Sequence, residues 1–194
     1  YLLSMIHVVK SVRAGNSNVY FAGAVASYVL SLFSKEMAVS LPLMAVLVYL
    51  YLSRGSLQKM KFAIPRFFVL ALVTAAYWFF RTRAIGGTGQ ADYYNDSFWV
   101  TLLSQTKVFI NYIVISMAPY PLSARYDIDL IYTAFNPYTV ICFALLAAVA
   151  AVTIRSLRTG SFPLWLFGIW WFLIALLPVS NILPIRGIMM ADRY

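Results

Sequence analysis

The chain has 194 residues, of which 62% are hydrophobic and 11% charged, whereas about a quarter of the residues of a typical soluble domain are charged; this composition excludes a soluble globular domain. The formal net charge of +9 does not indicate a nucleic-acid partner, because the basic excess of so apolar a chain usually lies in loops and sets membrane orientation. One His and one Cys, Cys142, exclude an intrachain disulfide and a convincing zinc or haem site.

Hydrophobic runs account for most of the chain. A helix that crosses about 30 Å of hydrocarbon needs roughly 20 apolar residues. Five runs approach this length, after the end of an earlier span at residues 1–9: 18–33, 37–53, 66–80, 138–154 and 162–180. The sequence therefore predicts an all-α, polytopic transmembrane helical bundle with about five to six spans. Because the chain begins within an apolar stretch and stops after a charged cluster, we expect an internal segment of a single membrane domain.

The first polar break between long runs contains Lys35 and Glu36. The turn is too short to carry these side chains far from the bilayer surface. Charges near hydrocarbon cost a few kcal/mol, so they usually face a cavity, a partner or a ligand. Two interpretations are open. The residues mark the water boundary, or the Lys35 ammonium binds an anionic group while Glu36 orients it.

Residues 98–119 form a less typical run. They are numerous enough to cross a membrane, but Ser104, Lys107 and Asn111 recur at spacings of three and four residues. On a helix these side chains make one polar stripe. Such a helix lies in the membrane interface or turns its stripe toward a water-filled cavity.

The distribution of charge favours an interfacial or re-entrant helix at 98–119. If this segment does not cross, the loops 10–17, 54–66 and 155–160 share one side. These loops carry cations and no acid: Lys10, Arg13, Arg54, Lys59, Lys61, Arg66, Arg155 and Arg158. Every acid then lies on the other side: Glu36, Asp92, Asp96, Asp127, Asp129 and Asp192. Basic loops are typically cytoplasmic, so Lys35 and the loop 120–137 are predicted to face the external or lumenal side.

The loop 122–137, "LSARYDIDLIYTAFNP", is the second candidate site. It places Arg125, Tyr126, Asp127 and Asp129 within five residues. In an extended segment both aspartates lie on one face. One of the carboxylates would then act as a base or bind a sugar hydroxyl. The alternative is a solvated loop with a local salt bridge.

The end of the chain, "LPVSNILPIRGIMMADRY", is the third candidate. Asn181, Arg186, Asp192 and Arg193 lie among apolar residues there, which is typical of a segment at the bilayer surface. The planar guanidinium of arginine can donate two hydrogen bonds to one phosphate. The stretch therefore suggests an anionic, lipid-linked ligand.

Four motifs together resemble a known family. They are "SKE" at a turn between spans, "P-x-x-LS" with a nearby "Y-D" at 119–127, "LPVSNILPI" and "ADRY". From about residue 18 to the end, the chain is similar to the membrane domain of the transmembrane-and-TPR protein O-mannosyltransferases and their bacterial relatives. The resemblance implies a GT-C type glycosyltransferase. Such an enzyme transfers a sugar from a polyprenyl-phosphate carrier to a Ser or Thr hydroxyl of a protein, on the lumenal or periplasmic face of the endoplasmic reticulum or bacterial inner membrane.

The resemblance also implies roles for individual residues. Lys35, Arg125, Arg186 and Arg193 would bind the donor phosphate. The supporting residues would be Glu36, Tyr126, Asp127, Asn181 and Asp192. The general base would be an acid in an external loop before Tyr1, and TPR repeats would follow Tyr194, so the catalytic residue is unknown and the segment alone is expected to be inactive. The resemblance names no metal site and leaves divalent-metal dependence open; the lipid-linked sugar and the protein acceptor are the implied partners.

Two other classes of function are open. A transporter or flippase of a lipid-linked or anionic substrate would also place charges at the ends of spans and a polar stripe on 98–119. Against it, no other run carries a charge in its middle, and the sequence shows no inverted repeat with paired broken helices. The third class is a non-catalytic scaffold that holds a partner in the membrane.

Overall fold

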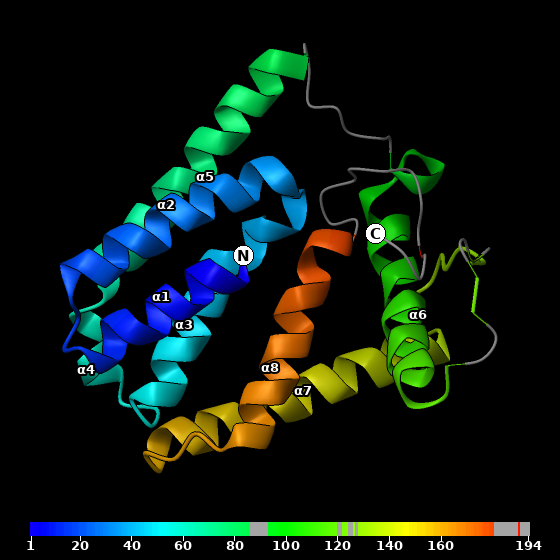
Figure 1. Ribbon diagram of the computed structural model, residues 1–194. Coiled ribbons are helices and arrows are strands. Elements are labelled where there is room, and N and C mark those ends of the chain that lie inside the picture. Colours follow the sequence, from blue (N-terminus) through cyan, green and yellow to red (C-terminus); the bar gives the residue numbers. More distant parts are fainter. Residues whose placement is uncertain (86–92, 120–121, 124–125, 127, 181–189, 191–194) are drawn as a thin grey trace. The chain divides into compact units, whose positions relative to one another are not determined.

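The computed structural model describes residues 1–85, 93–119, 122–123, 126, 128–180 and 190. Every regular element in these ranges is a helix, which confirms the all-α prediction for the described part of the chain. The helices form two compact units (Figure 1). Unit 1 contains Tyr1–Gly86 and Val152–Pro178, and unit 2 contains Gly87–Ala151 and Val179–Tyr194.

Most helices follow one another closely, although residues 118–136 separate α6 from α7. In chain order they are α1 (Leu2–Arg13), α2 (Asn18–Ser34), η1 (Glu36–Ser40), α3 (Leu41–Leu52), α4 (Leu57–Lys61), α5 (Ile64–Ile85), η2 (Tyr94–Asp96), α6 (Phe98–Met117), α7 (Pro137–Arg158), α8 (Leu164–Leu176) and η3 (Leu177–Val179). Gly15 follows α1 with a φ of 64°, a left-handed conformation that costs glycine little. Pro42 lies in the first turn of α3, where its missing N–H breaks no helical hydrogen bond.

Small and polar residues bring the helices of unit 1 close together. The buried Ser4 hydroxyl of α1 donates to the Ala24 carbonyl of α2 at 2.8 Å. Next to it, Gly23 leaves room for the ring of His7, since a Cβ at this position would lie 2.7 Å from His7 Cδ2. The fully buried Tyr28 shares a 2.7 Å hydrogen bond with Thr74 of α5. Close helix contacts through small residues and interhelical hydrogen bonds are typical of helices in membranes.

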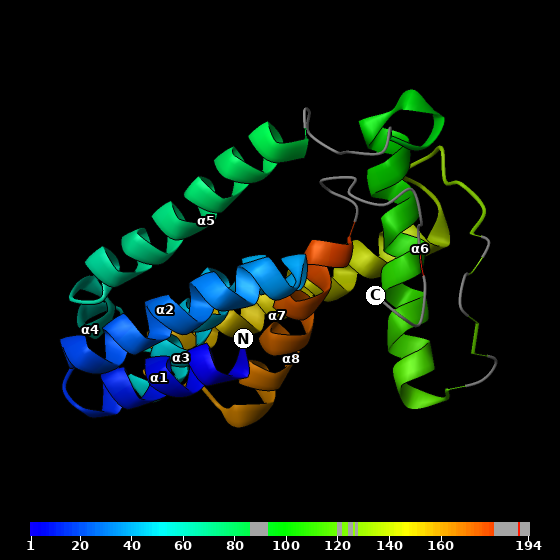
Figure 2. The same cartoon turned by 45° about the horizontal axis from the view of Figure 1, so that its top comes forward.

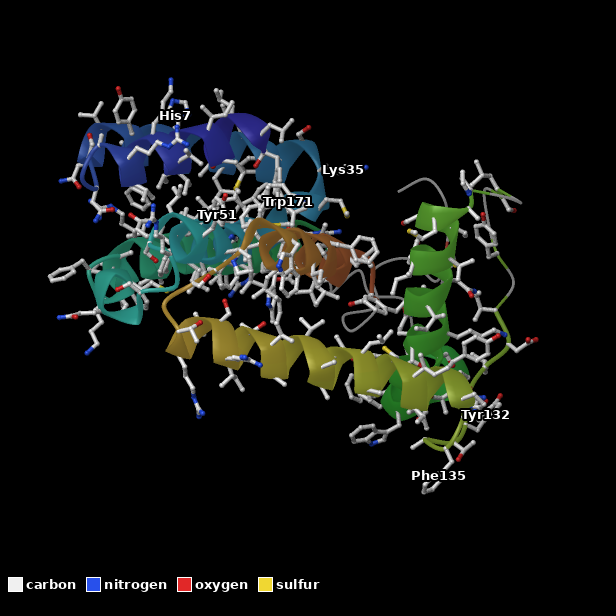
Figure 3. All side chains as sticks on the ribbon, turned by 90° about the horizontal axis from the view of Figure 1, so that it is seen from below. His7, Lys35, Tyr51, Tyr132, Phe135 and Trp171 are labelled. Carbon is white, nitrogen blue, oxygen red and sulfur yellow. The ribbon has the colours of Figure 1, made fainter. Side chains whose placement is uncertain are left out.

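Aromatic side chains connect α3 with α8 in the same unit. The rings of Tyr51 and Phe167 have centroids 4.9 Å apart, and Phe167 in turn lies 5.6 Å from Trp171. Figure 3 shows Tyr51 and Trp171 between the two helices. Aromatic pairs of this kind stabilise helix packing beyond the effect of the apolar area that they bury.

The three basic loops lie at one end of unit 1 (Figure 1). Arg66 donates from Nη2 to the Asn16 carbonyl and, at 2.9 Å, to Asn18 Oδ1. A Cβ at Gly55 would lie 3.5 Å from Leu157 Cδ2. This arrangement agrees with the common side predicted from charge for residues 10–17, 54–66 and 155–160. Which membrane face they occupy stays a prediction.

Three described helices are long and apolar enough to cross a membrane: Ile64–Ala84, Phe98–Met117 and Pro137–Arg158. The other apolar helices are shorter; α8, with 13 residues, extends only about 20 Å at 1.5 Å per residue. Helix length therefore supports a membrane protein but not five to six spans. It also places 98–117 among the possible spans, because this segment forms one unbroken helix of 20 residues rather than a re-entrant turn.

Candidate functional site

The structure describes only part of the predicted site. Lys35 and Tyr126 are described in full, and for Glu36 only the backbone is. The other predicted residues lie outside the described ones: Arg125, Asp127, Asn181, Arg186, Asp192 and Arg193. Lys35 belongs to unit 1 and Tyr126 to unit 2.

Lys35 lies at the tip of the turn after α2. Its backbone is extended, with φ −156° and ψ 132°, so the residue interrupts the helical path between α2 and η1. Its N–H donates to the Ser31 carbonyl at 3.0 Å, and its carbonyl accepts from Ala38 N at 3.1 Å. Figure 3 shows the side chain pointing away from the helices. This placement agrees with both interpretations of Lys35: a residue that marks the boundary between membrane and water, and an ammonium that binds an anionic ligand.

In unit 2 the polar stripe of α6 is covered by the chain's own segment 128–131. The fully buried Ser104 hydroxyl accepts a hydrogen bond from Ile131 N at 2.8 Å. One turn further on, Lys107 Nζ lies 2.9 Å from Asp129 Oδ2. A later segment of the chain therefore supplies partners for Ser104 and Lys107. Whether the stripe faces the membrane interface or a water-filled cavity stays a prediction.

Alternate residues of that segment pack onto α6. Tyr126, Ile128 and Leu130 lie against a small core made by Val108 of α6 and Met190. Asp129 points outward, with a side chain 96% exposed. The alternation has the period of two expected of an extended chain. Beyond this segment the exposed Tyr132 and Phe135 point outward (Figure 3).

A backbone contact joins Tyr126, in one of the predicted motifs, to Met190 in the C-terminal stretch. Tyr126 N donates to the Met190 carbonyl at 3.2 Å, and Met190 is completely buried. The Tyr126 hydroxyl accepts from Ser123 N at 2.9 Å, which holds the ring in place. Thus Tyr126 meets Met190, the residue before "ADRY", beside α6. Sequence analysis assigned no role to Met190, although a flexible apolar side chain of this kind often fills irregular gaps.

The ion pair of this site changes the chemistry available to Asp129. The hydrogen bond from Lys107, and next its positive charge, hold the pKa of the Asp129 carboxyl below its usual value of 3.8. Lys107 Nζ also lies 5.6 Å from the centroid of the Tyr138 ring, a favourable cation–π geometry. A general base works best with a pKa near the operating pH. Asp129 is therefore better suited to accepting hydrogen bonds from hydroxyl groups than to removing a proton.

Comparisons with known proteins leave the family open. No protein-family model matches the chain, and neither a curated protein nor a solved structure matches it. The resemblance to O-mannosyltransferases therefore depends on the four motifs alone. Within the described ranges, no group of three or more His, Cys, Asp or Glu side chains is placed to hold a metal ion.

Proposed function

We propose that this chain is part of a membrane glycosyltransferase that transfers a sugar from a polyprenyl-phosphate carrier to a protein hydroxyl on the external or lumenal face. The observation that carries the proposal is the contact of Tyr126 with Met190. Tyr126 belongs to one motif of the resemblance, and Met190 directly precedes another, "ADRY". Their contact supports a shared binding site for these two motifs.

The proposed reaction is a direct displacement at the anomeric carbon. The acceptor hydroxyl oxygen forms the new bond to that carbon, the bond to the phosphate oxygen breaks, and the hydroxyl proton goes to the base. Cations near the departing lipid phosphate lower the barrier, because they stabilise the charge that develops on it. Arg125 precedes Tyr126 directly and Arg193 follows Met190 by three residues. We assign this role to both arginines, and Arg186 is the next candidate for it.

The remaining residues have supporting roles in the proposal. Asp127 would contact the sugar or the acceptor, beside Asp129, whose ionised carboxylate is already turned outward. Asn181 and Asp192 lie in the same C-terminal stretch and would orient the phosphate ligands. The general base is expected before Tyr1.

The contacts of α6 count against the transport alternative. That alternative needs the polar stripe of α6 to line a path for the substrate. Instead, Ser104 and Lys107 bond with residues 131 and 129 of the same chain. A transferase requires no such path.

The decisive experiment uses the full-length protein in vesicles with a radiolabelled polyprenyl-phosphate sugar and Ser- or Thr-containing peptides. We expect label on the peptide. Arg125→Gln should slow transfer by about a hundredfold, a typical cost of losing one group that stabilises developing charge, while Arg158→Gln in a basic loop should not. Carrier movement across the vesicle without transfer to any acceptor would overturn the proposal in favour of a flippase.

Lys35 needs a separate test, because its role depends on the resemblance. If its ammonium binds the donor phosphate, Lys35→Ala should lower transfer at least tenfold while expression is unchanged. Lys61→Ala removes the same charge at the end of α4 and is the matched control. Full activity of Lys35→Ala would leave Lys35 as a residue that marks the water boundary.

A further inference from the structure

An apolar groove runs between α2 and α5 within unit 1. Its volume is about 600 Å³, in the range typical of ligand sites. Leu32 and Phe33 of α2 form part of one wall, and Ala76, Tyr77 and Phe80 of α5 form part of the other. Figures 1 and 2 show the two helices that form it, in blue and green.

The sequence explains why the helices leave space here. Toward the middle of α2 the Tyr28–Thr74 hydrogen bond of 2.7 Å holds it against α5. Beyond that bond, α5 presents the small side chain of Ala76 to the groove. Phe33 meets Tyr77 edge to face, with ring centroids 6.2 Å apart. The groove therefore has aromatic walls.

The groove has one cationic end. Arg81 is the charged residue among its described lining residues, and its guanidinium lies 5.2 Å from the Trp78 ring. It lies near the end of α5, which stops at Ile85, as the aligned α2 stops at Ser34. An apolar trough that leads to a guanidinium at the end of membrane helices is complementary to an amphiphile with an anionic head.

The groove is open along its length. Phe33 and Phe80 at its walls are 79% and 67% exposed, so a ligand can enter sideways from the lipid. A chain much longer than the groove can also continue out into the bilayer. An enclosed cavity would not accept such a chain.

This proposal rests on the proposed function. We propose that this groove binds the isoprenoid chain of the polyprenyl-phosphate donor, with the phosphate at the Arg81 end, and that Arg81 is a phosphate ligand in addition to those named above. The apolar walls would bury the chain next to the head group, and the guanidinium would donate two hydrogen bonds to the phosphate. The proposal therefore gives the donor lipid a binding surface in unit 1.

The first test is photo-crosslinking of the full-length protein in lipid nanodiscs with a benzophenone-bearing polyprenyl phosphate. Crosslinked peptides should come from α2 and α5. Ala76→Trp fills the groove and should reduce the yield about tenfold, since it removes the buried contacts of one to two apolar groups. Ala75→Trp is the matched control, because Ala75 is exposed and lies outside the lining. Ala84→Trp, at a second lining position, covers the case in which Ala76→Trp does not fold.

The second test concerns the phosphate. Arg81→Gln should raise the Kd for a fluorescent polyprenyl phosphate about tenfold, the scale of a lost charge-assisted hydrogen bond. Arg83→Gln removes an equal charge two residues away, where the guanidinium lies over Phe79 instead, and should have little effect. The uncharged polyprenol should bind both variants equally.

Three results would overturn the proposal: equal crosslinking of Ala76→Trp and Ala75→Trp, crosslinked peptides outside α2 and α5, or competition by phosphatidylglycerol as strong as that by unlabelled polyprenyl phosphate. These measurements need no sugar transfer. If the groove binds the carrier but no transfer occurs, only the proposed function fails. If transfer occurs and Ala76→Trp leaves binding unchanged, only the groove assignment fails.

Discussion

Lys107 shows how one residue acquires a partner that its own helix does not offer. On α6 it belongs to a polar stripe, yet its side chain is only 19% exposed because Asp129 and Tyr138 lie against it. Exposed ion pairs contribute little to stability, so the pair acts mainly by fixing the position of the segment that carries Asp129.

The lowered pKa of Asp129 leads to a pH prediction. A carboxyl with a folded-state pKa below the usual 3.8 stabilises the fold above its unfolded-state value, and this contribution is lost as pH falls through the folded-state pKa. Between pH 6 and pH 3, the unfolding midpoint of the wild type should therefore fall more than that of Asp129→Asn. Thermal unfolding in detergent micelles measures both. Asp96→Asn in η2 is the control, and it should behave like the wild type.

At the scale of elements, α6 and the segment 126–131 form one packing unit. The helix supplies a buried hydroxyl and apolar side chains, while the segment supplies a backbone donor at Ile131 and three inward side chains. A buried N–H without an acceptor is costly. The Ser104 hydroxyl therefore helps to fix the position of Ile131 and of the loop around it.

Removing that acceptor should destabilise the protein. Ser104→Ala leaves Ile131 N without its 2.8 Å partner, which should lower the free energy of unfolding by about 1–3 kcal/mol. Ser116→Ala is the control, because the exposed Ser116 bonds only to the Tyr112 carbonyl one turn away and should change stability by less than about 0.5 kcal/mol. Equal unfolding curves for the two variants in denaturant titrations would contradict the packing role of Ser104.

The contact of α1 with α2 offers a second prediction for elements. Gly23→Ala puts a Cβ 2.7 Å from His7 Cδ2, and such overpacking typically costs about 1–3 kcal/mol. Gly168→Ala in α8 meets nothing within 4 Å and should stabilise its helix by up to about 1 kcal/mol. Chemical unfolding measures the change in stability of both variants. Adding His7→Ala to Gly23→Ala should recover part of the loss; no recovery would show that the His7 contact is not the cause.

At the scale of the whole molecule, the cationic residues of unit 1 lie toward its two ends. Its basic loops lie at one end. At the opposite end, Lys35 follows α2 and Arg81 lies near the end of α5. Loops rich in Lys and Arg are typically cytoplasmic. The charge pattern therefore predicts that the cations at the opposite end face outward, where the proposed donor phosphate would meet them.

Cysteine labelling in intact cells tests this orientation. In the Cys142→Ala background, Ser34→Cys and Asp129→Cys should react with an impermeant maleimide from outside, and Gln58→Cys only after lysis. The side chains of all three positions are exposed. Labelling of position 34 without position 129 would show that α6 crosses the membrane, as its length permits.

Much of the fold is readable from the sequence, because helix formation in an apolar chain depends on local features. The runs 66–80 and 138–154 lie within α5 and α7, and Cys142 is buried as a small hydrophobic residue. The number of spans is not readable in the same way. Apolar composition extends through η1 and η3, where the helix path changes, so run length exceeds the length of the α-helix.

The sequence by itself indicated a helical membrane protein, the candidate motifs and a predicted separation of basic loops from acids, because these follow from composition, periodicity and short spacings. Only the tertiary structure decided that Asp129 and Ile131 cover the polar stripe of α6, that Tyr126 meets Met190, and that α2 and α5 leave a groove ending at Arg81. Contacts between distant residues depend on which surfaces pack together, and spacing along a chain does not specify them.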